Sequence, residues 1–179
     1  MAKMRGWAMA IGLLILAAVP AQAQVDLLPE IRGGVLARGV GHDGMAVEDA
    51  NLEVLFAVPA LSPALVPVEI RPHLGATLST AGKESFVYGG LSLTARVPLV
   101  PVFGEVSIGG AVHNQAMLGN AAPQRFGCAA LLRASASVGV DVLPGVSVMG
   151  TLEHYTDGGL CGVPDNGLTN AGLRAGIRF

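Results

Sequence analysis

Residues 132–142 read Leu-Arg-Ala-Ser-Ala-Ser-Val-Gly-Val-Asp-Val, and this stretch decides the class of fold. Every second residue from Leu132 to Val142 is apolar, and the residues between them are charged, small and polar, or glycine. Successive side chains of a β-strand point to opposite faces, so a strict two-residue period predicts a strand. The same period predicts that one face of this strand is apolar and the other polar.

The alternation recurs along most of the chain. Each repeat covers roughly 9–12 residues, which is the length that a tilted strand needs to cross a bilayer. The predicted strands are residues 30–40, 50–58, 70–78, 86–96, 102–113, 132–142, 146–156 and 168–179. A transmembrane helix is not predicted, because prolines interrupt the most apolar later segment, residues 54–68.

The apolar face of these strands consists mostly of Val, Leu, Ala and Ile. In a soluble sandwich or a lipocalin-like periplasmic barrel, this face would form the core, and larger aromatic side chains would be expected there. We interpret the aliphatic face as facing lipid, with the soluble barrel as the alternative. The sequence therefore predicts an all-β fold, an eight-stranded antiparallel transmembrane β-barrel with up-and-down topology.

The opposite face carries charges of both signs. Side chains fill the interior of an eight-stranded barrel, so these charges predict an internal ion-pair network and argue against a general solute channel. The predicted inward set includes Arg32, Arg71, Arg133, Arg174, Arg178, Glu53, Glu105, Asp141 and Glu153.

Residues 1–23 have the features of a cleaved signal peptide. Two basic residues precede an apolar stretch at 7–19, and residues 21–23 read Ala-Gln-Ala, the small-x-small spacing of a signal-peptidase site. A membrane-anchor helix is the alternative, but this stretch is shorter than the ~20 residues that a span needs. We therefore expect residues 24–179 to form a single domain in the outer membrane of a Gram-negative-type bacterium.

The chain contains two cysteines, Cys128 and Cys161. In an exported protein such a pair most simply forms one disulfide, and two unrelated buried thiols are the alternative. Bacterial barrels have short inner turns and longer outer loops, and with periplasmic termini both cysteines would lie at the outer end. The predicted outer loops are residues 41–48, 80–84, 114–128 and 157–167.

Composition and motifs exclude several other classes of function. The formal net charge is −2 and only 13% of residues are charged, so no nucleic-acid partner is expected. His42, His73 and His113 are scattered along the chain, and two cysteines alone do not make a metal site. We find no phosphate-binding loop or cofactor motif, so the sequence predicts neither a cofactor nor a metal.

The last two predicted strands carry a more specific signal. Residues 152–161 read Leu-Glu-His-Tyr-Thr-Asp-Gly-Gly-Leu-Cys, and residues 165–179 read Asp-Asn-Gly-Leu-Thr-Asn-Ala-Gly-Leu-Arg-Ala-Gly-Ile-Arg-Phe. This end of the chain resembles the lipid A 3-O-deacylase family of outer-membrane barrels, also grouped with acyloxyacyl hydrolases. Members carry His-x-Ser-Asn, a Gly-rich stretch, Asn-x-Gly-Leu-Glu and a similar closing strand. The resemblance is sharp over residues 145–179.

The resemblance implies a Ser-His-Glu triad that removes an ester-linked acyl chain from the 3-position of lipid A. His154 matches the general base, and Thr156 stands where the family has its serine nucleophile. Thr169 stands where the family has the Glu that orients the histidine. Asp157 replaces an Asn linked to the oxyanion hole, and Gly159 matches a glycine whose N–H is thought to help there. The implied partners are lipid A, or whole lipopolysaccharide, and outer-membrane lipids.

The strand period supports this placement independently. His154 and Thr156 share the parity of Leu152, and Thr169 shares the parity of Leu173, which is the lipid side in both strands. These three polar side chains can therefore meet outside the barrel wall near the outer rim, which suits a substrate in the outer leaflet. The alternation in the last strand, which ends at the aromatic Phe179, resembles the C-terminal signature of proteins inserted by the barrel-assembly machinery. This resemblance implies that the machinery is a partner during insertion.

Three of the matched positions differ from the family. Threonine adds a β-branch beside the attacking oxygen, and loss of the acid costs about 10⁴ in rate in the serine-protease template. An Asp would bring negative charge near a developing oxyanion. Two functions therefore stay open: an esterase acting on lipid A with reduced activity, and a non-enzymatic barrel that is structural, adhesive or lipopolysaccharide-binding. An alternative alignment, shifted by one residue, would put Leu168 instead of Thr169 at the position of the family's orienting Glu.

Overall fold

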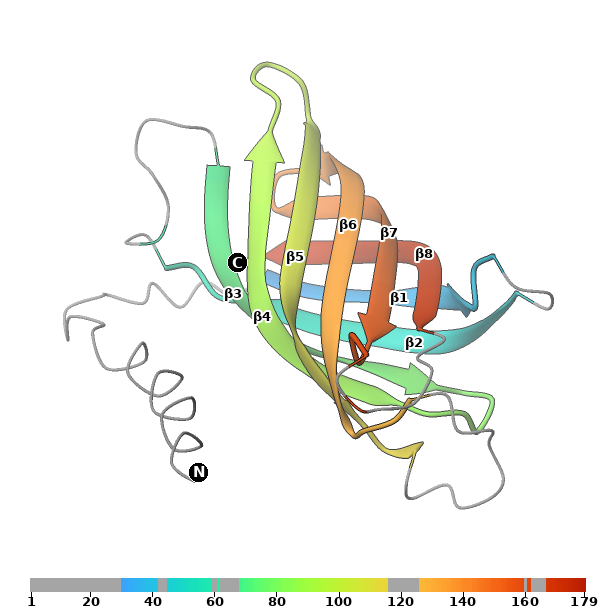
Figure 1. Ribbon diagram of the computed structural model, residues 1–179. Helices are drawn as coiled ribbons and strands as arrows, with labels where there is room; N and C mark the ends of the chain where they lie inside the picture. The colour runs from blue at the N-terminus through green and yellow to red at the C-terminus, as the bar shows by residue number, and fades with distance from the viewer. Residues whose placement is uncertain are drawn as a thin grey trace, which may run out of the picture.

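Eight antiparallel strands form a closed barrel, which confirms the predicted fold class. The computed structural model describes residues 30–41, 45–58, 61, 68–115, 126–159, 161 and 167–179. The strands are β1 (Glu30–Arg38), β2 (Ala46–Leu55), β3 (Val68–Ser79), β4 (Phe86–Arg96), β5 (Val102–His113), β6 (Ala130–Leu143), β7 (Val146–Thr156) and β8 (Leu168–Arg178). β1 pairs with both β2 and β8, so every strand has a neighbour on each side (Figure 1). The predicted signal peptide lies outside the described residues.

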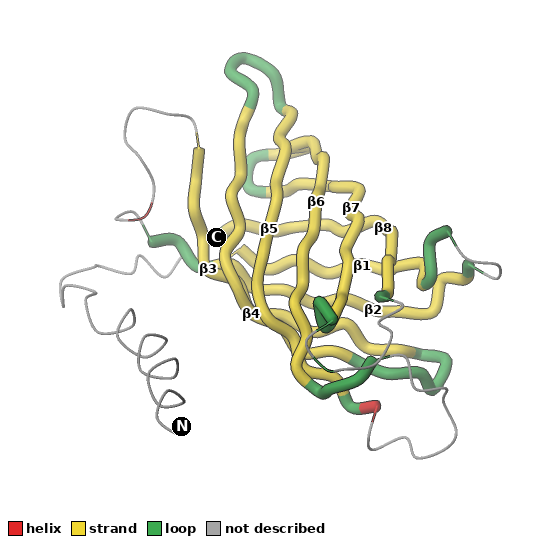
Figure 2. Tube along the Cα trace, viewed as in Figure 1, coloured by secondary structure: helices red, strands yellow, loops and turns green. Residues whose placement is uncertain are grey.

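The prediction for the second strand was wrong in its boundaries. The sequence predicts residues 50–58, whereas β2 spans Ala46–Leu55. Gly39 and Gly41 adopt positive φ angles of 74° and 88°, which lets the chain turn directly after β1. Pairing with β1 therefore begins earlier than the alternation indicates, and the outer connection covers residues 39–45 instead of the predicted 41–48. The loops gather at the two ends of the barrel, as Figure 2 shows.

Side chains of both charges fill the barrel interior, as predicted. Arg32 is 1% exposed and donates to both carboxylate oxygens of Glu105, at 2.5 and 2.9 Å. Farther along the barrel, Arg133 and Arg174 each donate to Glu153 Oε2, at 3.0 and 2.9 Å. Buried charges are tolerated when they are paired and hydrogen-bonded, and this network fills the interior together with a smaller cluster of buried apolar residues around Phe86 and Tyr155.

The outer face of the barrel is an aliphatic belt. On β5 and β6, Val106, Ile108 and Val138 expose 53, 70 and 68% of their surfaces. The rings of Phe86 and Tyr155 lie inside instead, stacked with their centroids 4.2 Å apart. An apolar band of this extent is unfavourable in water and is typical of a surface that faces lipid.

Among the described residues, no helix is long and apolar enough to cross a membrane.

Candidate functional site

Strands β7 and β8 place His154 and Thr169 directly opposite each other. His154 Nδ1 and Thr169 Oγ1 are 2.8 Å apart, a hydrogen bond on the exposed side of the wall. Leu168 is only 1% exposed and points into the barrel. The predicted parity is therefore confirmed, and Thr169 rather than Leu168 is the residue that faces the histidine. The pair lies toward the end of the barrel opposite to the Glu30–Arg178 pair.

Thr156 is the next outward-facing position along β7. Its Oγ1 accepts a hydrogen bond from the Gly158 backbone N–H at 2.9 Å. Gly158 and Gly159 adopt positive φ angles of 64° and 73°, so the chain bends back immediately after the strand. Gly167 lies against the imidazole, because a Cβ at this position would be only 2.7 Å from His154 Cε1. The histidine ring thus lies between the Thr169 hydroxyl and Gly167, where an added Cβ would force the ring to shift.

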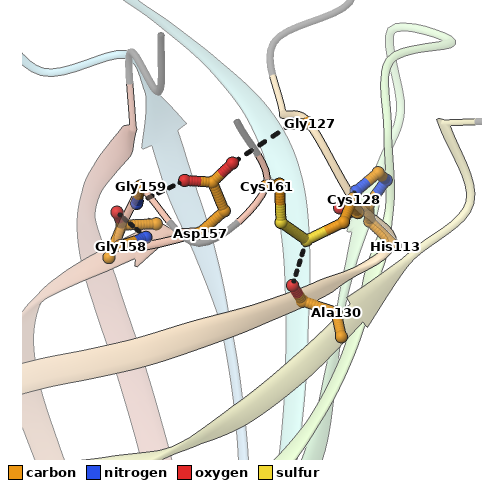
Figure 3. Close-up of a disulfide and its surroundings, with 9 residues drawn as sticks. His113, Gly127, Cys128, Ala130, Asp157, Gly158, Gly159 and Cys161 are labelled. Atoms are coloured by element: carbon orange, nitrogen blue, oxygen red, sulfur yellow. Dashed lines mark hydrogen bonds between the residues drawn. A yellow bond between two sulfur atoms is a disulfide. The ribbon is translucent and has the colours of Figure 1, made fainter. Parts of the chain in front are cut away.

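The Asp157 carboxylate is turned away from this outer face. It is 2% exposed and has the inward parity of Tyr155. Its Oδ1 accepts from Gly159 N at 2.8 Å, and its Oδ2 accepts from Gly127 N at 3.3 Å (Figure 3). The sequence interpretation put this negative charge near a developing oxyanion, whereas the carboxylate is buried on the inner side of the turn. The Gly159 N–H, expected to serve the oxyanion, is engaged by Asp157.

The predicted disulfide between Cys128 and Cys161 is present, with Cα atoms 5.7 Å apart. It joins the connection before β6 to the connection after β7 (Figure 3). A carboxylate oxygen of Asp157 and the two sulfur atoms all lie within 4.8 Å of one another. Metal binding by cysteine requires thiolates, and bonded sulfurs do not supply them, so this cluster is not a metal centre while the bridge is closed.

An apolar groove of about 690 Å³ crosses the outer wall and starts one outward-facing position along the strands from His154 and Thr169. Its lining includes Leu152 and Ala171, which pair with each other and are the next outward-facing residues from His154 and Thr169. The groove continues across β6 and β5 to β4, and its shape and apolar lining suit a hydrocarbon chain. The small outward-facing residues that open it include Ala95, Gly104, Ala136 and Gly150.

These features define a class of protein, an outer-membrane β-barrel with a histidine-centred polar site on its lipid-facing wall. The chain belongs to the lipid A 3-O-deacylase (PagL) family, whose sequence profile matches residues 70–178. No curated protein matches the chain by sequence.

Solved structures share the fold. The crystal structure of the outer membrane enzyme PagL superposes with a TM-score of 0.67 at 18% identity, covering 84% of this chain and 99% of that chain. The Yersinia pestis outer membrane protein Ail, in a phospholipid bilayer nanodisc, gives 0.53 at 14% identity, covering 84% and 98%. Neisserial surface protein A (NspA) gives 0.53 at 11% identity, covering 84% and 97%. At these identities the likeness establishes the fold.

Sequence reasoning missed three parts of this site. Gly167 stands in the quoted Asn-Gly-Leu segment, but its contact with the imidazole depends on the return of the chain into β8. Gly127 contributes only a backbone N–H, which no side-chain pattern can indicate. The groove needs the register of five neighbouring strands, β4 to β8, before its alanines and glycines come together.

Proposed function

We propose that this protein is an esterase that hydrolyses the 3-O-linked acyl chain of lipid A, with His154 as its general base. The observation that carries the proposal is the 2.8 Å hydrogen bond between His154 and Thr169 on the lipid-facing wall, next to an apolar groove. A base held by a neighbouring side chain beside a hydrocarbon-sized groove suits an ester whose acyl chain is embedded in the outer leaflet. Family membership supports the same reaction.

The proposed reaction uses Thr156 as the nucleophile. Its Oγ1 attacks the ester carbonyl carbon while His154 takes the hydroxyl proton. The bond between the former carbonyl carbon and the 3-oxygen of the sugar then breaks. His154 gives the proton to that oxygen, which leaves as the 3-hydroxyl. Water, deprotonated by the same histidine, attacks the acyl-threonine, releasing the fatty acid and restoring Thr156. Thr169 holds the imidazole through Nδ1, the part that a carboxylate plays in the serine-protease template.

The groove gives the acyl chain a direction along the wall. Neighbouring strands lie about 4.8 Å apart, so the three steps from β7 to β4 cover about 14 Å of surface. A fatty acyl chain lying there would leave its ester end beside His154 and its methyl end near Ala95 on β4. We therefore propose that the residue at position 95 limits the length of the accepted chain.

The substitutions in the triad lower the expected rate. A threonine hydroxyl orients the imidazole but does not carry the negative charge that stabilises the imidazolium. The second candidate function is a non-enzymatic lipopolysaccharide-binding barrel, which the uncharged Thr169 partner of His154 favours.

Incubation of the purified protein with lipid A of defined structure distinguishes the esterase from the non-enzymatic lipopolysaccharide-binding barrel. Chromatography of the released fatty acids should detect a slow ester-derived product that disappears in His154→Ala. Release at the same rate by wild-type protein and His154→Ala would reject the site. No release, together with saturable lipid A binding, would favour the second function.

A further inference from the structure

The outer connections on either side of β6 and β7 are tied together twice. The disulfide joins Cys128 to Cys161, and the Asp157 carboxylate accepts the N–H of both Gly127 and Gly159 (Figure 3). Both ties link the segment before β6 to the turn after β7. Each carboxylate oxygen has its own N–H donor, and such charge-assisted hydrogen bonds are stronger than neutral ones.

The segment before β6 is itself anchored to the barrel. His113 Nε2, at the end of β5, lies 2.8 Å from the carbonyl oxygen of Cys128. Phe126 is 4% exposed and packs edge-on against Phe86, with ring centroids 6.0 Å apart. The bonds from Asp157 and Cys161 therefore connect the turn after β7 to a segment that is itself held against the barrel by His113 and Phe126.

The turn held in this way contains the proposed nucleophile. Thr156 immediately precedes Asp157, and its Oγ1 receives the Gly158 N–H at 2.9 Å. Asp157 engages the Gly159 N–H at 2.8 Å on the inner side of the same turn. The N–H groups of Gly158 and Gly159 therefore point to opposite sides of the turn. The first is bonded to Thr156 Oγ1, the proposed nucleophile, and the second to the buried Asp157 carboxylate.

We propose that the disulfide and Asp157 form a clasp that positions the turn of residues 156–159 for ester hydrolysis. Asp157 is a positioning residue, and the backbone N–H bonded to the proposed nucleophile is that of Gly158, while the Gly159 N–H is bonded to Asp157. This inference rests on the proposed function. The clasp lies beyond the paired strands of the barrel, so opening it loosens the turn while the barrel stays closed.

Amide hydrogen exchange tests the mechanical part of the proposal without needing activity. The probes are the Gly127, Gly158 and Gly159 amides in the folded, full-length mature protein in detergent micelles. Asp157→Ala and the paired Cys128→Ser, Cys161→Ser variant should each exchange at these amides on the order of tenfold faster, the size of a lost local constraint. Asp157→Asn keeps one acceptor oxygen, so it should release fewer amides than Asp157→Ala.

The matched control is Asp141→Ala, which removes a carboxylate that pairs with Arg96 at the opposite end of the barrel. It should leave exchange at the three glycines unchanged. Every variant should keep the heat-modifiable migration of a folded barrel. Wild-type exchange rates at the turn in both Asp157→Ala and the paired serine variant would overturn the clasp.

Kinetics test the positioning role. In a background with Thr156→Ser and Thr169→Glu, opening the clasp should lower kcat for lipid A by about tenfold or more with little change in KM, and Asp157→Asn should restore part of the loss. Faster exchange with unchanged kcat would overturn the positioning role. If the Thr156→Ser, Thr169→Glu protein folds but is inactive, the proposed function and the catalytic role of the clasp are both rejected. The exchange rates then still decide whether the clasp holds the turn.

Discussion

We predict that placing the serine and the glutamate of the family motif at positions 156 and 169 creates or raises lipid A deacylation by this barrel. In the combined variant Thr156→Ser and Thr169→Glu, the serine removes the β-branch and the glutamate returns a charge beside His154. Thr169 Oγ1 already lies 2.8 Å from His154 Nδ1, so a carboxylate at position 169 reaches the same nitrogen without a change of register. Absence of the acid costs about 10⁴ in the serine-protease template, so a gain between about 10² and 10⁴ is expected. Asp157 stays unchanged, because its carboxylate is bonded to Gly127 and Gly159 on the inner side.

The assay is mass spectrometry of purified lipid A, which records the loss of one 3-O-linked acyl group over time. Each single substitution should gain little, since a triad acts as a unit. The matched control combines Thr156→Ser with Leu168→Glu, whose side chain points into the barrel and cannot reach His154. Activity that survives the addition of His154→Ala would refute the reasoning. A folded but inert double variant would refute it as well.

Three further predictions concern the ring, the interior and the bridge. Gly167→Ala should displace the His154 ring and abolish deacylation, because the new Cβ would be 2.7 Å from Cε1, while urea unfolding in lipid vesicles changes much less than catalysis. Glu153→Gln removes a fully buried charge shared by two arginines, so the same unfolding assay should show a loss of about 3–5 kcal/mol. Thiol labelling of native protein should find neither Cys128 nor Cys161 free, and reduction should lower the free energy of unfolding by about 3–4 kcal/mol for the 33-residue separation. Normal deacylation by Gly167→Ala, unchanged unfolding of Glu153→Gln or of the reduced protein, or labelling of both thiols without reductant would contradict the corresponding statement.

The fold was largely predictable because the barrel wall faces lipid on its outer side and charged groups on its inner side. Each strand therefore alternates apolar and polar residues with a period of two. β6 shows this most clearly, and its predicted residues 132–142 lie within Ala130–Leu143. β2 was less predictable because its first residues pair with β1 through a glycine turn, while Met45, Ala46 and Val47 show no alternation. Turn geometry set that boundary rather than side-chain pattern.

The candidate site was predictable where it depends on strand parity. His154 and Thr169 belong to strands adjacent in sequence, so their meeting on the outer wall followed from counting residues in each strand. The direction of Asp157 was missed because the sequence interpretation carried over a role from an aligned position. Its inward parity, shared with Tyr155, was already visible in the sequence, but its partner Gly127 lies in a different loop.

The central claim is that His154 serves an esterase acting on lipid A at the lipid-facing wall. The most direct measurement is mass spectrometry of lipid A from cells that express the wild-type protein, cells that express His154→Ala, and cells that lack the protein. The account predicts a fraction of lipid A lacking one 3-O-linked acyl group only in wild-type cells, and a larger fraction with Thr156→Ser and Thr169→Glu. Identical lipid A in all of these cells, with each variant folded in the outer membrane, would contradict it.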